Sequence, residues 1–296
     1  DCDFVVAIGG GSPLDAAKAI SALNKNREIT CDDLYRGDSL VAFPIIAIPT
    51  TSGTGSEVTP YSILTDGNGI KKGFGMPSAF PIVSFLDAGY TLTMSREVTL
   101  ATALDALSHS LEGEIVNNGY NPLVKMLSVE STGIIYRVLP RLIDRERDFA
   151  LREKMQYAAM LAGMSYGTES AGAVHAMSQT AGGYYDLPHG VLTAAMLPPV
   201  MAYNYLGEPV KYARIAQAMG VNTWGMTQIE AAESAVDAVR DFVSLLEIPS
   251  VTELGVKKED MQMLVDMAYN DPQTIGNPRD LTRKSYEQIY AACFEV

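Results

Sequence analysis

Three histidines and one aspartate are the side chains in this sequence whose types and spacing could hold a metal ion. Asp105 and His109 are four residues apart, which on a helix places both side chains on one face. His175 and His189 are fourteen residues apart with Gly182-Gly183 between them, so the chain could leave one helix and bring a second imidazole back. One carboxylate and three imidazoles suit Fe(II) or Zn(II) better than Mg(II) or Ca(II). A lone histidine is more often a hydrogen-bonded core residue or a surface switch, and spacing alone does not show that the two pairs meet.

A glycine-rich turn near residue 10 has the composition of a phosphate-binding loop. Gly9-Gly10-Gly11-Ser12 separates an apolar run from a helical stretch. Glycine lets the backbone approach a phosphate closely, and the free N–H groups at a helix start attract negative charge. Ser12 is the expected N-cap, Pro13 the first helical residue and Asp15 part of the first turn. The alternative is a strand-to-helix turn that needs glycine only for its shape.

A second polar loop follows another apolar run. Between Thr50 and Thr59 the chain has six hydroxyl side chains and two glycines, which gives many hydrogen-bond donors with little bulk. Such a loop suits a ligand rich in oxygen atoms, such as a pyrophosphate joined to a ribose. The alternative is a hydroxyl-rich surface turn. Two such loops after two neighbouring strands favour a nucleotide site more strongly than one loop does.

The elements that must position these residues change character near residue 90. Short apolar runs predict buried strands at 4–8, 43–48, 61–65 and 82–86, with a helix over 13–23. From about residue 91 the apolar residues recur at helical spacing, and helices are expected at 98–115, 122–139, 151–164, 210–219, 230–246, 258–269 and 283–294. Turns are expected at 117–119, 182–183, 207–209 and 271–272. The pattern predicts an α/β part followed by an all-helical part.

Composition excludes several classes of protein. The sequence has 296 residues, of which 47% are hydrophobic, and a formal net charge of -13. That charge argues against a nucleic-acid-binding surface. No apolar run is long enough to cross a bilayer, which predicts no membrane partner. Cys2, Cys31 and Cys293 have no paired spacing, which favours free thiols in a reducing cytoplasm.

Five motifs follow one another along the chain. They are Gly9-Gly10-Gly11-Ser12-Pro13-x-Asp15-x-x-Lys18, Pro49-Thr50-Thr51-x-Gly53-Thr54-x-Ser56-Glu57-Val58-Thr59, Asp105-Ala106-Leu107-x-His109, His175-Ala176-Met177 and Pro188-His189-Gly190. In this order, over essentially the full length, they resemble the iron-containing (group III) alcohol dehydrogenases. The resemblance implies a partial Rossmann-like nucleotide-binding domain over residues 1–90. It also implies an all-helical, metal-binding catalytic domain over 91–296, in a dehydroquinate-synthase-like arrangement.

The resemblance also assigns roles to individual residues. The family's metal ligands fall on Asp105, His109, His175 and His189. Its contacts with NAD or NADP fall on Gly9, Gly10, Gly11 and Ser12, with Asp15 beside them, and on Thr50, Thr51, Thr54, Thr59 and Lys72. Many members carry a further histidine where this chain has Gln179, so any proton relay at that catalytic-site position is in doubt. The strand–helix units with which the family normally opens, including the part that recognises the adenosine, do not precede the first motif here.

The implied activity is a metal-dependent alcohol dehydrogenase. Fe(II) is the expected metal and Zn(II) the alternative, with hydride passing between NAD or NADP and a small alcohol or aldehyde. Other interpretations stay open: a zinc glycerol-dehydrogenase-like enzyme, a dehydroquinate-synthase-like lyase, a nucleotide- and metal-binding fragment without catalysis, and a metal-stabilised helical domain. The strand edge beside residues 4–8 would invite pairing with another chain, so a homo-oligomer is expected.

Overall fold

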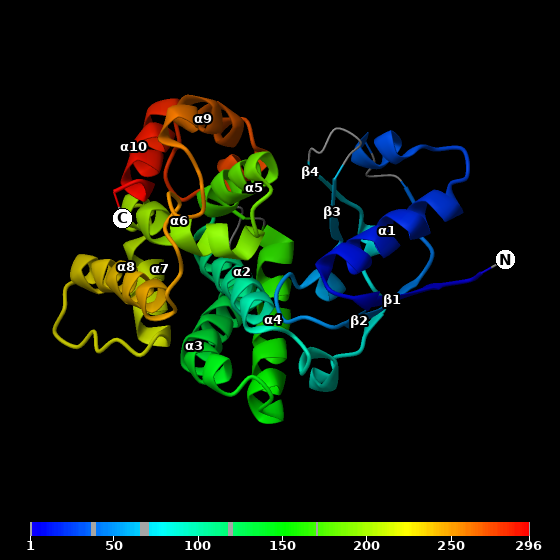
Figure 1. Ribbon diagram of the computed structural model, residues 1–296, viewed down its shortest axis with the longest axis horizontal. Coiled ribbons are helices and arrows are strands. Elements are labelled where there is room, and N and C mark those ends of the chain that lie inside the picture. Colours follow the sequence, from blue (N-terminus) through cyan, green and yellow to red (C-terminus); the bar gives the residue numbers. More distant parts are fainter. Residues whose placement is uncertain (1, 37–39, 66–70, 118–120, 170, 296) are drawn as a thin grey trace.

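The computed structural model describes residues 2–36, 40–65, 71–117, 121–169 and 171–295. Its first part is built on a parallel sheet of strands β1 (Val5–Gly9), β2 (Ile45–Pro49) and β5 (Val83–Ser84), in the order β1-β2-β5. Val5 pairs with Ile45, and Ile46 pairs with Val83. Helix α1 (Gly11–Lys25) packs on one face of this sheet (Figure 1). The strands predicted around residues 4–8, 43–48 and 82–86 are present, although β5 is short. Their predicted burial is wrong for β1 and β5, because α1 covers only one face of the sheet and Val6, Ile8 and Val83 on the other face are exposed.

The strand predicted at 61–65 exists but was wrongly assigned to a buried layer. β3 (Tyr61–Thr65) pairs antiparallel with β4 (Lys71–Gly75) in a separate two-stranded sheet. Ser62 points inward, whereas Tyr61 and Ile63 are exposed. β4 was not predicted, because the sequence Lys-Lys-Gly-Phe-Gly has no apolar run and no clear alternation. The hairpin lies beside α1 (Figure 1).

Helix α1 begins two residues earlier than predicted. Its N-cap is Gly10, in an extended conformation, so Ser12 is not the N-cap and Pro13 is not the first helical residue. Asp15 consequently lies beyond the first turn. The backbone carbonyl of Gly10 accepts the first helical hydrogen bond, from the N–H of Leu14, at 3.2 Å. The cap has no side-chain hydrogen bond, so the preference of serine for this position did not decide the boundary.

The rest of the described chain is helical. The α-helices are α2 (Arg96–Ile115), α3 (Pro122–Asp144), α4 (Phe149–Glu169), α5 (Ala173–Tyr185), α6 (His189–Asn204), α7 (Pro209–Ala218), α8 (Gln228–Leu245), α9 (Met261–Tyr269) and α10 (Arg283–Cys293). Short 3₁₀ helices are η1 (Cys31–Arg36), η2 (Ser56–Val58), η3 (Pro77–Ala79), η4 (Ala88–Thr91), η5 (Lys258–Asp260) and η6 (Pro272–Gly276). Local signals mark several starts: the Ser95 side chain accepts from Val98 N, and Thr227 forms a capping box with Glu230.

Most predicted helices are confirmed, but α5 and α6 were not among the predicted ranges, and three predicted features differ from the structure. The turn predicted at Gly182-Gly183 lies inside α5, which instead ends at Tyr185 and is followed by Asp186 as its C-cap, in the left-handed conformation with φ of 53°. Helix α3 continues through Pro140 to Asp144, beyond the predicted end. The segment predicted as one helix over 258–269 is divided into η5 and α9. The turn predicted at 117–119 falls largely outside the described residues.

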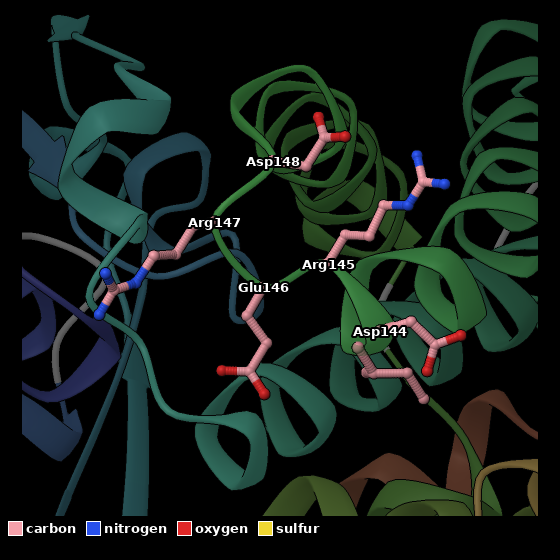
Figure 2. A pocket seen from close by; sticks show the side chains of 6 residues that line it. Asp144, Arg145, Glu146, Arg147 and Asp148 are labelled. Atoms are coloured by element: carbon pink, nitrogen blue, oxygen red, sulfur yellow. The ribbon is translucent and has the colours of Figure 1, made fainter.

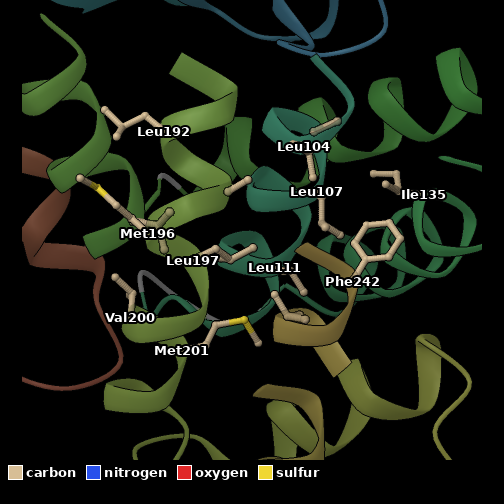
Figure 3. Close-up of a cluster of buried hydrophobic side chains, with 14 of the residues drawn as sticks. Leu104, Leu107, Leu111, Ile135, Leu192, Met196, Leu197, Val200, Met201 and Phe242 are labelled. Atoms are coloured by element: carbon tan, nitrogen blue, oxygen red, sulfur yellow. The ribbon is translucent and has the colours of Figure 1, made fainter. Parts of the chain in front are cut away.

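Helix α2 lies at the centre of the hydrophobic core. Figure 3 shows Leu104, Leu107 and Leu111 of α2 among side chains of α3, α6 and α8. The last carbonyls of α2 are also bound: Lys125 Nζ donates to Gly113 O at 2.7 Å, and Lys211 Nζ donates to Ile115 O at 3.2 Å. A helix packed on several sides and capped by two ammonium groups is a rigid support for the residues that it carries. Within the described ranges, no helix is both long and apolar enough to cross a membrane.

Candidate active site

The four predicted metal ligands come from three helices, and three of them form one close group. Asp105 and His109 share one face of α2, His175 lies in the first turn of α5, and His189 is the first residue of α6. Asp105 Oδ1 is 3.8 Å from His109 Nε2, 3.9 Å from His175 Nε2 and 3.5 Å from His189 Nε2. Asp105, His175 and His189 each offer a ligand atom within 4.8 Å of the others. The structure thus brings His175 and His189 to Asp105. His109 Nε2 is close to Asp105 Oδ1, but His109 is not part of this group of mutually close ligand atoms.

The donor atoms of this cluster fit a bound cation. Asp105 Oδ1 and His175 Nε2 are buried and have no hydrogen-bond partner. Unpaired buried polar atoms are costly, and a shared cation would satisfy both. Two donor atoms that bind one ion at about 2.1 Å with a tetrahedral angle lie about 3.4 Å apart, close to the distances seen here. His109 and His175 are also stacked, with ring centroids 4.6 Å apart.

The electrostatics of the cluster keep its carboxylate charged. Burial alone would raise the pKa of Asp105, but the neighbouring His109, His175 and His189 outweigh burial and hold that pKa well below its usual range. Burial lowers the pKa of His109 to about 3, despite the Asp105 carboxylate. A charged carboxylate beside a neutral imidazole is the state in which both bind a cation.

Glu112 belongs to the site although the sequence analysis did not single it out. One of its carboxylate oxygens pairs with His175 Nδ1, and the other accepts from Val174 N at 2.8 Å. Burial opposes protonation of His175, but the Glu112 carboxylate raises the pKa of this imidazole to about 10. A carboxylate on the far nitrogen fixes the ring of a ligating histidine and leaves Nε2 for the metal. Its spacing could have indicated Glu112 from the sequence, because Glu112 follows His109 by three residues on the same helical face.

The two polar loops meet beside this cluster. Thr50 N donates to Gly9 O at 2.9 Å. A Cβ at Gly10 would come within 3.1 Å of the Thr51 methyl carbon, and one at Gly11 within 2.7 Å of the Thr54 methyl carbon. The glycines are therefore required by the close approach of the two loops. The predicted contacts of Gly9, Gly10, Gly11, Ser12, Thr50, Thr51 and Thr54 with a dinucleotide stay a prediction.

One buried atom in the second loop has chemistry that suits a ligand. Ser52 Oγ is buried and has no hydrogen-bond partner. A hydroxyl without a partner in a polar loop can donate to an oxygen atom of a bound molecule.

A buried network attaches α1 to the second loop. Lys18 Nζ donates to Ser56 Oγ at 2.7 Å and to Tyr61 O at 2.5 Å, and it lies 3.5 Å from Thr59 Oγ1. Asp15 accepts from Ser56 Oγ at 2.5 Å and from Ile63 N at 2.9 Å. Burial lowers the pKa of Lys18 to about 8. In this structure the polar groups of Asp15 and Thr59 face the network, and their predicted cofactor contacts stay untested.

Two further predicted site residues lie in different surroundings. Lys72 is an exposed residue of β4, with Nζ 5.7 Å from the centroid of the Tyr35 ring. Gln179 follows His175 by one turn of α5, and its side-chain oxygen accepts from Gln273 Nε2 of η6 at 2.9 Å. Gln179 is half-buried, and its predicted place in the active site, like the predicted position of Lys72 near a nicotinamide, stays a prediction.

The turn between α3 and α4 forms a surface hollow that is separate from the candidate site. It is lined by residues 143–148. Figure 2 shows that the side chains of Arg145, Glu146, Arg147 and Asp148 point in different directions. None of the lining residues is a predicted ligand or loop residue, and this hollow does not belong to the candidate site.

Comparison with known proteins identifies the family. Residues 1–88 match the family described as iron-containing alcohol dehydrogenase, and residues 99–294 match the C-terminal part of the Fe-containing alcohol dehydrogenase family. The chain therefore belongs to the iron-containing alcohol dehydrogenases, as its five motifs indicated.

The alignments with individual relatives include nearly all of this chain and about three quarters of each relative. Choline dehydrogenase of Bacillus subtilis (strain 168) is 40% identical over 302 residues, covering 100% of this chain and 75% of the relative. NAD-dependent methanol dehydrogenase of Bacillus methanolicus is 34% identical, covering 98% of this chain and 76% of the relative. The crystal structure of a 1,3-propanediol oxidoreductase has a TM-score of 0.93 and 35% identity, covering 99% of this chain and 77% of that one. The likeness confirms a small sheet followed by a helical part.

Proposed function

We propose that this chain is an NAD(P)-dependent alcohol dehydrogenase whose divalent metal is held by Asp105, His109, His175 and His189. The observation that carries the proposal is the close approach of Asp105, His175 and His189 from three helices, with unpartnered ligand atoms on Asp105 and His175. His109 Nε2 lies 3.8 Å from Asp105 Oδ1 and is proposed as the fourth ligand. The two small-residue loops that meet at Gly10 and Thr51 supply a nucleotide cradle nearby. Family membership supports the same activity.

The mixed carboxylate and imidazole donor set favours Fe(II), with Zn(II) as the alternative. When bound, such a cation polarises the oxygen of an alcohol or aldehyde and lowers the pKa of the alcohol. Asp105 supplies the negative charge of the site, and Glu112 holds the His175 ring in place. Burial of Asp105, His109 and His175 limits access of water to the reacting groups.

A small primary alcohol or the corresponding aldehyde is the proposed substrate. Three relatives are named for choline, methanol and 1,3-propanediol, each of which has a primary hydroxyl group. Hydride would pass between the carbinol carbon and the nicotinamide. The Gln179–Gln273 amide pair can form hydrogen bonds with the substrate but cannot take up a proton near pH 7. Gln179 would therefore orient substrate rather than transfer a proton.

Other features of the proposal concern the whole protein. The helical part after a Rossmann-like nucleotide-binding part would give the dehydroquinate-synthase-like arrangement, with residues 1–90 and 91–296 as the two domains. The three cysteines are free in the structure, which agrees with a cytoplasmic location. A homo-oligomer agrees with the exposed apolar side chains of β1.

The test combines turnover with metal-dependent stability. Purified protein is loaded with Fe(II) or Zn(II) and assayed with NAD and NADP on methanol, 1,3-propanediol and choline. His189→Ala should abolish turnover and remove the rise in melting temperature that metal gives the wild type. A ligand at 100 times its Kd stabilises the folded state by about 2.7 kcal/mol, and this is the stabilisation that the variant would lose.

The metal-free proteins provide the control. Without metal, wild type and His189→Ala should melt at similar temperatures, because the His189 side chain is about one-third exposed. An equal loss of stability with and without metal would show that His189 is a packing residue. Binding of metal and nucleotide without turnover of any primary alcohol would instead favour a binding protein without catalysis.

A further inference from the structure

Tyr166 of α4 lies between the metal cluster and the second polar loop. Its ring stacks on the His109 ring, with centroids 4.0 Å apart and planes inclined by 11°. His109 is stacked in turn on His175. The Tyr166 ring is therefore the end of a stack that contains two of the four proposed ligands, and it limits how far the His109 ring can turn.

The other end of the same side chain holds the loop. Tyr166 Oη donates to the backbone carbonyl of Thr54 at 3.3 Å. The Thr54 side chain faces Gly11, where an added Cβ would lie 2.7 Å from its methyl carbon, and its Oγ1 accepts from Ser56 N at 3.3 Å. The hydroxyl of Tyr166 thus fixes a residue that lies against the glycine loop.

The surrounding packing leaves little room for the loop and α4 to move independently. A Cβ on Gly167 would lie 2.8 Å from the Thr59 methyl carbon, and one on Gly163 would lie 2.7 Å from Gly55 Cα. On the opposite side, a Cβ on Gly53 would lie 2.6 Å from Thr102 Cβ of α2. Loop residues 53–59 are therefore wedged between the helix that carries Asp105 and His109 and the helix that carries Tyr166.

We infer that Tyr166 is a positioning residue that couples occupancy of the metal site to binding of the nicotinamide nucleotide. Metal binding fixes the His109 ring, and the stacked Tyr166 ring then holds Thr54 in the position that faces the glycine loop. Each ligand consequently binds more tightly when the other is present. The inference rests on the proposed function, because it needs both a metal and a nucleotide at the sites described above.

The coupling is measured with Zn²⁺ and NADH as probes on the full chain. NADH affinity is determined by fluorescence titration with and without zinc, and zinc affinity by chelator competition with and without NADH. Linkage requires the same coupling factor from both pairs of measurements. For the wild type the expected factor is about fivefold or more.

Tyr166→Phe keeps the ring on His109 and removes the donor to Thr54 O. Zinc affinity without NADH should stay unchanged, whereas the coupling factor should fall toward 1, by about twofold or more, as expected for one lost hydrogen bond. Tyr157→Phe is the matched control, because it removes a hydroxyl from an exposed tyrosine of the same helix. That variant should keep the full coupling factor.

The outcomes separate this inference from the proposed function. A wild type that binds zinc and NADH independently, or a Tyr166→Phe protein with the wild-type coupling factor, would overturn the inference and leave the dehydrogenase proposal intact. A variant that binds zinc more weakly to the same extent with and without NADH would also overturn it. A wild type that binds neither probe would overturn both.

Discussion

Helix α2 places three side chains of the candidate site on one face, and the sequence indicated only two of them. Asp105 and His109 stood out because their residue types and four-residue spacing match a ligand pair. Glu112 did not, because glutamate on a helix is ordinarily a solvated residue and its partner His175 is 63 residues away. Only the packing of α5 against the helical core shows that Glu112 is buried and paired.

Removal of Glu112 tests whether it supports the metal. Glu112→Ala leaves His175 Nδ1 and Val174 N without their partner, so the ring loses its fixed orientation. Zinc affinity, measured by competition with a chromophoric chelator, should fall about 10- to 100-fold. Glu97→Ala, at an exposed position on the same helix, should leave it unchanged. Equal zinc affinities for Glu112→Ala and wild type would show that Glu112 acts on folding alone.

At the scale of elements, periodicity predicted the helices well and the small sheet elements less well. Helices α3 and α8 were recognisable because their apolar residues recur on one face, and α2 and α4 because apolar residues recur at helical spacing. Helices α5 and α6 were not among the predicted ranges. The β3–β4 hairpin is held largely by backbone pairing and by its contact with α1, neither of which leaves a hydrophobic pattern. The start of α1 depended on the backbone of Gly10, where side-chain preferences carry no information.

The buried position of Lys18 predicts that the free energy of unfolding depends on pH. The folded-state pKa of Lys18 is about 8, below its ordinary value of 10.5, while Asp15 and Glu57 are the charged groups that face it. Between pH 8 and pH 10.5 Lys18 is protonated more in the unfolded chain than in the folded one. The free energy of unfolding therefore increases as pH rises through this range. From pH 8 to pH 10 the wild type should gain about 2 kcal/mol relative to Lys18→Met in urea unfolding. A difference that does not change with pH would show that Lys18 titrates normally.

Two glycines provide a matched test of the wedged loop. A Cβ at Gly53 would lie 2.6 Å from Thr102 Cβ and 2.9 Å from Thr102 O, so Gly53→Ala should destabilise the protein by about 1–3 kcal/mol. Gly183 lies in α5 with nothing within 4 Å of an added Cβ. Gly183→Ala should therefore stabilise by about 0.5–1 kcal/mol. Thermal unfolding of both variants measures the two effects, and a Gly53→Ala protein as stable as wild type would show that the loop can move away from α2.

For the whole molecule, the sequence predicted the order of the two parts but not how they meet. The change from strand patterns to helical patterns near residue 90 agrees with the observed elements. Where the two parts meet, Gly53 packs against Thr102 and Gly55 packs against Gly163. Close approach of small residues produces no periodic signal, so sequence patterns could not reveal it. The position of the two polar loops beside the Asp105 cluster follows from this contact.

The parallel sheet has one covered face and one bare face. Ala7, Ile45 and Ala47 are buried, on the face toward α1, whereas Val6, Ile8, Val83 and Phe85 are between 42% and 59% exposed. Val6 and Val83 both pair with Ile46, so these side chains form one continuous apolar face, and β1 is an edge strand of the sheet among the described residues. Such a face favours association of protein molecules in water.

Charges on the bare face should reduce self-association of this chain. Ile8→Lys combined with Phe85→Lys places two ammonium groups among the exposed apolar side chains. In sedimentation velocity over a range of protein concentrations, the double variant should remain smaller than the wild type, because burying either charge against another molecule is costly. The melting temperature should change little, since both side chains are more than half exposed. Trp224→Lys, at a residue that is 93% exposed and far along the chain from the sheet, should associate like the wild type. If the double variant and the wild type sediment identically at every concentration, association uses another surface.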